Sequence, residues 1–460
     1  MGQEEMMGNE TICALATAPG GALGIIRVSG PRAFDAVSAV SALHCDALSA
    51  NTIHFTRIIN DEGEVIDEVL VSVFRAPHSY TGEDSVEISC HGSRYILNKV
   101  IELLIQNGCR MAQPGEYTQR AFLNGKMDLS QAEAVADLIA SSNKATHQLA
   151  ISQLRGGISS ELDKLREQLL KLTSLLELEL DFSDHEELEF ADRTELKDLA
   201  NKIDKQIIHL AHSFEIGQSI KQGIPVAIVG KTNVGKSTLL NALLKDDRAI
   251  VSNIHGTTRD TIEDTIDIQG ITFRFIDTAG IRQTTDQVEQ IGIQRTFQAM
   301  HKARIVLWLI DANPAPEDIQ AILEETKYKS LIIIQNKIDK QEITIAPNSD
   351  LHKYTYVKIS AKSGIGLNQL EKAIFEAANI PSITDSDVII TNARHYESLL
   401  HAKQNLSRVL SGLNTSSVSG DLLAEDLRLV LSDLAEITGR GQITTNEVLE
   451  NIFTHFCVGK

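Results

Sequence analysis

The residues with the clearest chemical potential form the run Gly230-Lys231-Thr232-Asn233-Val234-Gly235-Lys236-Ser237. This is the G-x-x-x-x-G-K-[ST] pattern of a phosphate-binding loop, in which backbone amides surround a phosphate chain at the start of a helix. An apolar predicted strand, 226–229, precedes the loop, and a stretch with helical character, 238–244, follows it. We therefore expect Lys236 to reach the β- and γ-phosphates and Ser237 to bind Mg²⁺. The same phosphates are expected to contact Asn233, Val234, Gly235 and Thr238.

Two later motifs predict that the base of this nucleotide is guanine. Asn336-Lys337-Ile338-Asp339 follows a predicted strand, and a carboxylate there accepts hydrogen bonds from N1–H and the exocyclic amine, which adenine cannot offer. Ser360-Ala361-Lys362 is expected to close the base pocket through its backbone amides.

Two further motifs lie where a GTPase carries its switch segments. Asp277-Thr278-Ala279-Gly280 follows a strand; its Asp is expected near Mg²⁺ and its Gly amide near the γ-phosphate. Gly256-Thr257-Thr258 lies earlier, where a Mg²⁺-binding Thr belongs, and we assign that role to Thr258. The five motifs in this order predict GTP binding, and we extend the nucleotide contacts over residues Ser252, Asn253, Ile254, His255, Gly256 and Thr257.

Composition describes an ordinary globular protein in a reducing compartment. The 460 residues carry a net charge of −19, which argues against non-specific coating of nucleic acid. The five cysteines are scattered without a C-x-x-C pair, and no apolar run approaches membrane-spanning length. We expect a cytoplasmic protein without structural zinc.

The elements that position these motifs predict a multidomain α/β protein. Residues 1–124 read as an α+β domain with strands at 24–29, 68–74 and 85–89 and a helix at 93–106, while 79–84 and 113–124 read as loops and a helix start. A helical part at 125–220, with a leucine seam from Leu162 to Leu176, is interrupted by a Ras-like GTPase domain at 221–380 and resumes at 381–460. That domain is predicted to have a mostly parallel sheet with one antiparallel edge hairpin around Gln269-Gly270.

Ile281 makes the hydrolytic machinery unusual. Ras-like GTPases, which this chain resembles, carry Gln after D-T-A-G to orient the attacking water, and Ile281 has no polar atom. Asn233 resembles the Asn of potassium-dependent, Era-like GTPases. That resemblance implies a K⁺ held by Asn233 and by the loop residues Ser252, Ile254 and Thr257, in place of an arginine finger. Asn233 as a simple turn former is the alternative.

Motifs at both ends of the chain resemble the MnmE (TrmE) family, GTPases of tRNA wobble-uridine modification. They are Gly24-Ile25-Ile26-Arg27-Val28-Ser29-Gly30, Thr81-Gly82-Glu83-Asp84, Pro114-Gly115-Glu116 and the terminal Cys457-Val458-Gly459-Lys460. The resemblance covers nearly the whole chain from Thr11. It implies a homodimer whose folate-binding, aminomethyltransferase-like N-terminal domain takes 5-formyl-tetrahydrofolate as the one-carbon source.

The same resemblance implies particular site residues. The folate contacts are Arg27, Glu87, Lys126 and Lys460, although ion pairing and strand-face charge remain alternatives for the first three. Cys457 is either a buried small residue or a reactive thiol. Glu289 is implied to orient the attacking water, so that Glu289, Lys236 and Asn233 form the catalytic set.

Two functions follow from these expectations. In the first, the chain works with an FAD-dependent MnmG (GidA)-type partner, in a heterotetramer or larger complex. It adds a carboxymethylaminomethyl or aminomethyl group to C5 of U34 in certain tRNAs, and GTP hydrolysis opens and closes the paired GTPase domains. The alternative is a regulatory Era-like GTPase in ribosome assembly without tRNA chemistry. The N-terminal domain and the terminal tail favour the first, because they have no place in the second.

Overall fold

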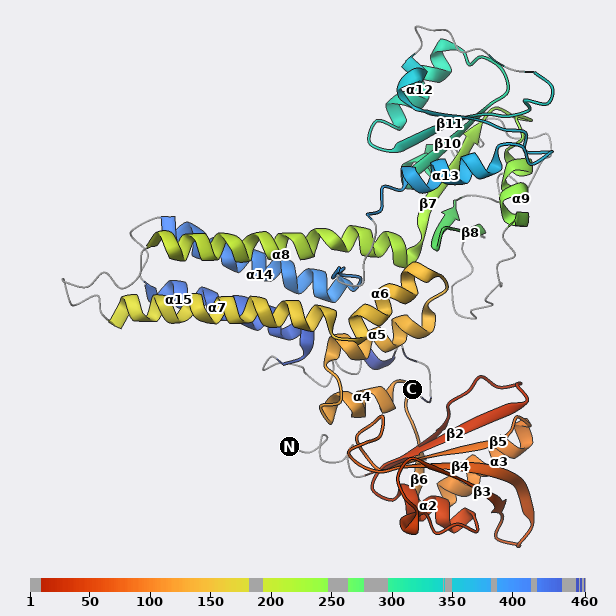
Figure 1. Ribbon diagram of the computed structural model, residues 1–460, viewed down its shortest axis with the longest axis vertical. Coiled ribbons are helices and arrows are strands. Elements are labelled where there is room, and N and C mark those ends of the chain that lie inside the picture. The colour runs from red at the N-terminus through yellow and green to blue at the C-terminus, as the bar shows by residue number, and fades with distance from the viewer. Residues whose placement is uncertain are drawn as a thin grey trace. The chain divides into compact units, whose positions relative to one another are not determined.

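The computed structural model describes residues 10–181, 193–246, 264–276, 297–341, 343, 350–381, 387–414, 420–440, 452–454, 456 and 459 (Figure 1). The chain divides into two compact units. The first contains Met1–Ala136, Gln153–Asp204 and His401–Lys460, and the second contains Asp137–Ser152 and Lys205–Leu400. Each unit holds one six-stranded sheet, so the multidomain α/β class is confirmed. Among the described residues, no helix combines the length and apolarity needed to cross a bilayer.

The sheet of the first unit has the order β3-β4-β5-β2-β1-β6. Its strands in chain order are β1 (Thr11–Leu15), β2 (Leu23–Ser29), β3 (Thr52–Ile59), β4 (Val65–Phe74), β5 (Ser85–His91) and β6 (Cys109–Met111). The predictions for β2, β4 and β5 are confirmed. β1, β3 and β6 were not predicted; β1 and β6 are short, and they pair in parallel at one end of the sheet.

The helices α2 (Ala33–Val40) and α3 (Arg94–Gln106) pack on this sheet and form a hydrophobic core with it. Their buried side chains, such as Val37 and Leu104, share one apolar cluster with Val71, Ile88 and Val28 of the strands. α3 lies within one residue of its predicted range and ends where Gly108 takes a positive φ of 95°. A 3₁₀ turn, η1, spans Cys45–Ala47.

Helices make up the rest of the first unit and continue into the second. They are α4 (Glu116–Leu123), α5 (Leu129–Ala140), α6 (Lys144–Leu154), α7 (Gly157–Asp181), α8 (Arg193–Gln222), α14 (Ala393–Asn414) and α15 (Gly420–Thr438). The predicted leucine seam of α7 packs against α15, and Leu169 and Leu172 are fully buried (Figure 1). α15 is followed by Gly439, which has a φ of 73°, a conformation common just after the end of a helix.

The sheet of the second unit has the order β12-β11-β10-β7-β9-β8. Its strands are β7 (Ile224–Gly230), β8 (Asp264–Ile268), β9 (Ile271–Phe275), β10 (Ile305–Ile310), β11 (Ser330–Gln335) and β12 (Thr355–Lys358). All pairings are parallel except that of β8 with β9, so the predicted antiparallel edge hairpin is confirmed. Helices α9 (Lys236–Asp246) and α12 (Pro316–Glu325) and the 3₁₀ turn η2 (Asp350–Lys353) lie between strands in the chain, and α13 (Leu367–Ala377) follows the last strand.

Candidate functional site

The phosphate loop turns tightly between β7 and α9, at the carboxyl edge of the parallel sheet. Two of its glycines have positive φ, 149° at Gly230 and 105° at Gly235. A Cβ on Gly230 would lie 2.5 Å from the carbonyl oxygen of Leu309, and one on Gly235 would lie 2.3 Å from Nδ2 of Asn336. Glycine is therefore required at both places by close approach as well as by backbone angle. Such a loop presents its amides at a helix N-terminus, where phosphate oxygens bind.

The Lys236 ammonium lies inside this loop. Its Nζ donates to the carbonyl oxygens of Gly230 at 2.6 Å and of Lys231 at 2.9 Å. Burial lowers the pKa of Lys236, which marks an ammonium held away from bulk water. A phosphate oxygen would be a stronger acceptor than these carbonyls, so the position suits the predicted role.

Asn336 joins the loop to the segment after β12. Its side chain is buried, with Nδ2 donating to the Val234 carbonyl at 2.8 Å and Oδ1 accepting the Ala361 amide at 3.0 Å. One side chain thus fixes the spacing between the phosphate loop and the Ser360–Lys362 segment. Asn336 therefore acts as a frame that holds these two segments of the site together.

Lys337 and Asp339 continue the same frame. The Lys337 ammonium donates to the Asn233 carbonyl at 2.7 Å and to Oδ2 of Asp311 at 2.6 Å. The Ser360 hydroxyl donates to Oδ1 of Asp339 at 2.7 Å, and this hydrogen bond holds the pKa of Asp339 below its ordinary value. Asp339 is exposed and ionised, as a carboxylate that accepts two donors from guanine needs to be.

A second cluster surrounds Arg27 in the first unit. Nε and Nη2 of Arg27 donate to Oε1 of Glu87 at 2.9 and 2.8 Å. The guanidinium lies 5.5 Å from the ring centroids of both Tyr80 and Tyr117. It also donates to the carbonyl of Gly459 at 3.4 Å, so the end of the chain returns to this strand. The pair is partly exposed, at 21% and 27% of the side-chain area, which leaves it accessible to a ligand.

Residues of the stretches 79–84 and 113–124, interpreted from the sequence as loops and a helix start, form a buried ion network beside this cluster. Arg120 donates to both carboxylate oxygens of Glu83 at 3.1 Å and to Glu116 at 3.0 Å. Burial alone would raise the pKa of Glu116, but hydrogen bonds from Arg110 and the Gln113 amide, together with the charge and hydrogen bond of Arg120, more than offset it and lower the pKa. No role was assigned from the sequence to Glu83, Glu116 or Arg120, or to the two tyrosines, because sequence spacing does not show that residues 83 and 120 meet.

The comparisons with known proteins agree along the chain. Residues 11–126 match the profile described as GTP-binding protein TrmE N-terminus, and residues 129–457 match the MnmE helical domain. The tRNA modification GTPase MnmE of Bacteroides thetaiotaomicron is 56% identical over 99% of this chain and 100% of its own. The protein of the same name from Cytophaga hutchinsonii is 50% identical over 98% of each chain. The chain belongs to the MnmE family of tRNA modification GTPases.

Membership in the MnmE family makes the chain a GTP hydrolase with the expected GTPase domain inserted into a helical domain. Among solved structures, the G domain of the T. maritima FeoB iron transporter is 26% identical and covers 34% of this chain and 99% of that one, with a TM-score of 0.24. A score this low adds nothing about the fold, which the strand order establishes.

The described residues bring together part of the predicted MnmE site. Asn233 to Thr238, Asn336, Lys337, Asp339 and Ser360 to Lys362 lie at one edge of the sheet. Lys126 lies in the first unit, where its Nζ donates to the Pro77 carbonyl at 2.8 Å. Other predicted residues fall outside the described part of the chain: Ser252 to Thr258, Asp277 to Gly280, Ile281, Glu289, Cys457 and Lys460.

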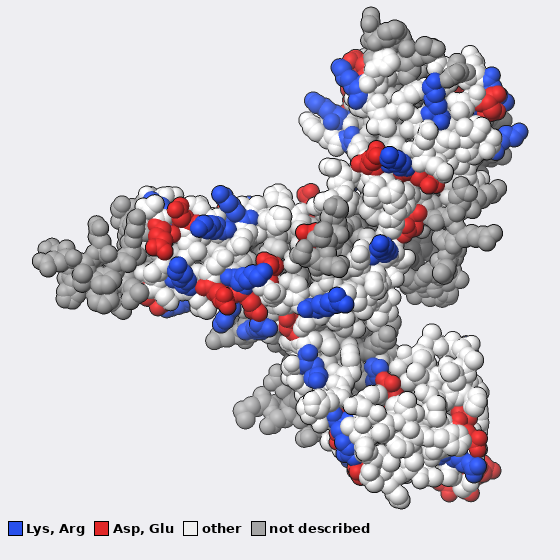
Figure 2. All heavy atoms as spheres, in the orientation of Figure 1, with Lys and Arg blue, Asp and Glu red and all other residues white. Residues whose placement is uncertain are grey.

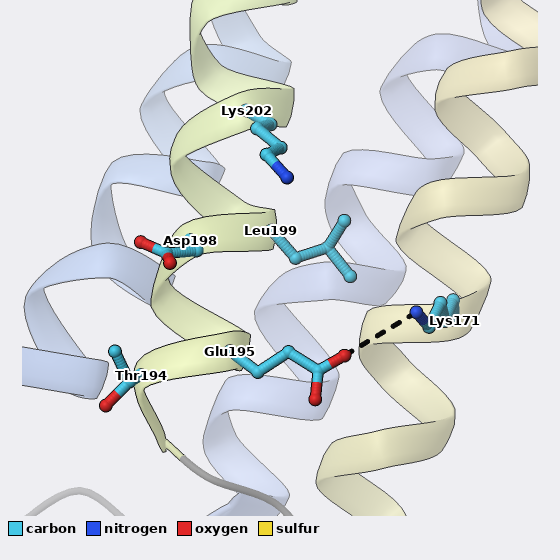
Figure 3. Close-up of a pocket in the computed structure, with 6 residues that line it drawn as sticks. All are labelled: Lys171, Thr194, Glu195, Asp198, Leu199 and Lys202. Carbon is cyan, nitrogen blue, oxygen red and sulfur yellow. Dashed lines mark ion pairs between the residues drawn. The ribbon is translucent and has the colours of Figure 1, made fainter.

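A hollow of about 320 Å³ between α7 and α8 contains none of these residues (Figure 3). Lysines and carboxylates line it in similar number, and Lys171 pairs with Glu195 at 3.7 Å. In the view of Figure 2, lysines and arginines alternate with acidic residues along these helices. Mixed charge of this kind indicates a solvated helix surface and not an anion site.

Proposed function

We propose that the chain is a K⁺-activated GTPase that modifies C5 of the wobble uridine U34 in certain tRNAs. It would work as a homodimer in the cytoplasm with an MnmG (GidA)-type FAD protein, in a heterotetramer or larger complex. The group added is carboxymethylaminomethyl or aminomethyl, with its one-carbon unit taken from 5-formyl-tetrahydrofolate. The domain boundaries that we propose are 1–124, 125–220, 221–380 and 381–460.

The GTPase part of the proposal is supported by the frame around Asn336. The buried side-chain amide of Asn336 binds both the phosphate loop and the Ser360–Lys362 segment. The residues expected to contact phosphate and those expected to contact guanine are therefore held at a set distance. We assign GTP binding to this frame, phosphate contact to Lys236, and Mg²⁺ to Ser237 with Thr258. K⁺ would be held by Asn233, Ser252, Ile254 and Thr257, and it would supply the positive charge of an arginine finger. Glu289 is assigned to orient the attacking water.

The folate part is supported by the Arg27 cluster. A carboxylate such as Glu87 can accept hydrogen bonds from the pterin edge, and Arg27 and Lys126 can pair with the glutamate tail. The partly exposed Arg27–Glu87 pair fits such a ligand, because its charges are already paired and pre-oriented in the protein. Lys460 would complete the site next to Gly459. We propose no chemical step for the Cys457 thiol.

The observation that carries the whole proposal is that one chain, which belongs to the MnmE family along its length, contains both the Asn336 frame and the Arg27 cluster. An Era-like regulator of ribosome assembly would have no use for the Arg27 cluster or for the tail that returns to it.

Mass spectrometry of wobble nucleosides tests this function. tRNA from cells that lack the gene should have lost the C5 modification at U34, and the wild-type gene should restore it. Lys236→Ala should fail to restore it because the phosphate contact is gone. Lys231→Ala is the matched control, since this exposed lysine of the same loop pairs with Asp318 and should be dispensable. Unchanged U34 in the deletion strain would refute the tRNA-modifying role and favour the regulatory alternative.

A further inference from the structure

The edge hairpin of the second unit is held by Asn143, the residue before α6, and by the first residues of α6. Nδ2 of Asn143 donates to the Thr272 hydroxyl of β9 at 2.7 Å, and the Ala145 amide donates to the Gly270 carbonyl at 3.1 Å. The approach is close, because a Cβ on Gly270 would lie 3.0 Å from Cβ of Lys144. These contacts join segments about 130 positions apart in the sequence.

Apolar packing supports the same contact. Ala145 and Leu149 of α6 are buried in one cluster with Ile266, Ile268 and Ile271 of the hairpin. α6 therefore packs as part of the core of the nucleotide-binding unit, although the sequence places it within a helical stretch. A shift of the hairpin has to move α6 or break this packing, since packed cores do not deform continuously.

Asn143 also begins α6. Its Oδ1 accepts the Thr146 amide at 2.8 Å, which is the hydrogen bond of a helix N-cap. One side chain thus holds the hairpin with its nitrogen and the helix with its oxygen. The two roles can be separated by substitution, because other residues cap a helix without reaching Thr272.

The position of the hairpin in the sequence connects this contact with the nucleotide site. β8 begins six residues after Thr258, and β9 ends two residues before Asp277, so the hairpin lies between the two predicted switch motifs. α6 starts in the second unit, and its last residues, Gln153 and Leu154, belong to the first. The hairpin is continuous in sequence with both switch motifs, and α6 is continuous with the helical region. The Asn143–Thr272 hydrogen bond therefore joins the two segments.

We propose that Asn143 is a positioning residue, whose hydrogen bond to Thr272 transmits movement of the β8–β9 hairpin during GTP turnover to α6. The inference rests on the proposed GTPase function and adds the route by which nucleotide state reaches the helical region. It assigns Asn143 no contact with GTP, so its loss should leave nucleotide affinity unchanged.

Three substitutions in the full-length protein separate this role from simple stability. Thr272→Val removes the hydroxyl and keeps the β-branched shape. Asn143→Ser keeps a good N-cap and loses the reach to Thr272. Asn143→Asp is the conservative control, because its carboxylate still caps α6 and can accept a hydrogen bond from the Thr272 hydroxyl.

Backbone hydrogen exchange over residues 143–150 is the readout, measured in K⁺ with GDP and with the β,γ-imido analogue of GTP. In the wild-type protein, exchange rates should differ between the nucleotides by about fivefold or more, as expected for coupled sites. In Thr272→Val and Asn143→Ser the difference should largely vanish, with nucleotide affinity retained, and Asn143→Asp should preserve it.

Two results would overturn the inference alone: equal exchange with both nucleotides in the wild type, or an undiminished difference in Thr272→Val and Asn143→Ser. A wild-type chain that binds neither nucleotide would instead refute the GTPase function, and this inference with it.

Discussion

At the scale of single residues, Asn233 combines a backbone role with a proposed ligand role. Its φ of 61° is left-handed, a conformation that Asn tolerates better than most residues, and its carbonyl accepts the Lys337 ammonium. The turn alternative therefore has direct support in the backbone. The cation role concerns only the side-chain oxygen, and a substitution can remove that oxygen while keeping the turn.

Asn233→Gly makes this separation, because glycine adopts a positive φ without strain. If the side chain holds K⁺, GTP turnover in wild-type protein should be faster in K⁺ than in Na⁺, and Asn233→Gly should lose about tenfold or more of the K⁺-dependent rate. Steady-state phosphate release in the two salts measures this. Equal wild-type rates in Na⁺ and K⁺, or normal K⁺ stimulation in Asn233→Gly, would leave Asn233 as a turn residue only.

At the scale of elements, the α7–α15 pair shows how a sequence pattern becomes a packed seam. Residues Leu162, Leu165, Leu169, Leu172 and Leu176 of α7 are all buried. α15 buries a matching row, Leu423, Leu427, Val430, Leu434 and Ile437. The ion pairs Arg428–Glu177 at 3.3 Å and Arg440–Asp163 at 2.8 Å show that the helices run antiparallel. These surface pairs add little energy, so the seam depends on its apolar side chains.

Leu169→Ala should destabilise the helical region by about 2–5 kcal/mol, because Leu169 is fully buried and its loss leaves a cavity. Leu170→Ala makes the same chemical change at a position 41% exposed, and should cost about 0.5 kcal/mol or less. Urea denaturation followed by circular dichroism compares the two midpoints. Similar shifts for both variants would contradict the seam.

At the scale of the whole molecule, the C-terminal tail returns to the Arg27 cluster near the beginning of the chain. Phe453 and Phe456 are buried against Leu129 and Ala132 and bring the tail back to this unit. Gly459 then approaches the carbonyl of Leu15 so closely that a Cβ would lie 2.3 Å from it, and its φ is 92°. Only glycine fits this position, because both the angle and the space exclude a side chain.

Gly459→Ala should therefore displace the tail and weaken binding of 5-formyl-tetrahydrofolate by about tenfold, the effect expected of a strained left-handed residue near a ligand. GTP turnover should stay unchanged, since Gly459 lies in the other compact unit. Gly63→Ala is the control, because Gly63 has a similar φ of 81° with nothing within 4 Å of an added Cβ. Calorimetric titration measures the affinities. Equal folate binding by Gly459→Ala and wild type would show that the tail is not part of the proposed folate site.

Local patterns in the sequence predicted many of the elements of the GTPase domain. The strand before Gly230, the helix after Lys236 and the hairpin at Gln269-Gly270 follow from spacing and turn chemistry within a few residues. β1, β3 and β6 were missed. Two of them are short, and their pairing depends on neighbours distant in the chain.

The sequence by itself determined the residue types of the phosphate loop, the guanine motif and the leucine seam, because each is a short-range spacing on one element. The return of the tail was expected only through the family resemblance. The tertiary structure decided which distant residues meet: Arg27 with Gly459, Arg120 with Glu83, Asn143 with Thr272. Such pairs depend on how helices and strands pack around a core, and no local periodicity encodes that packing.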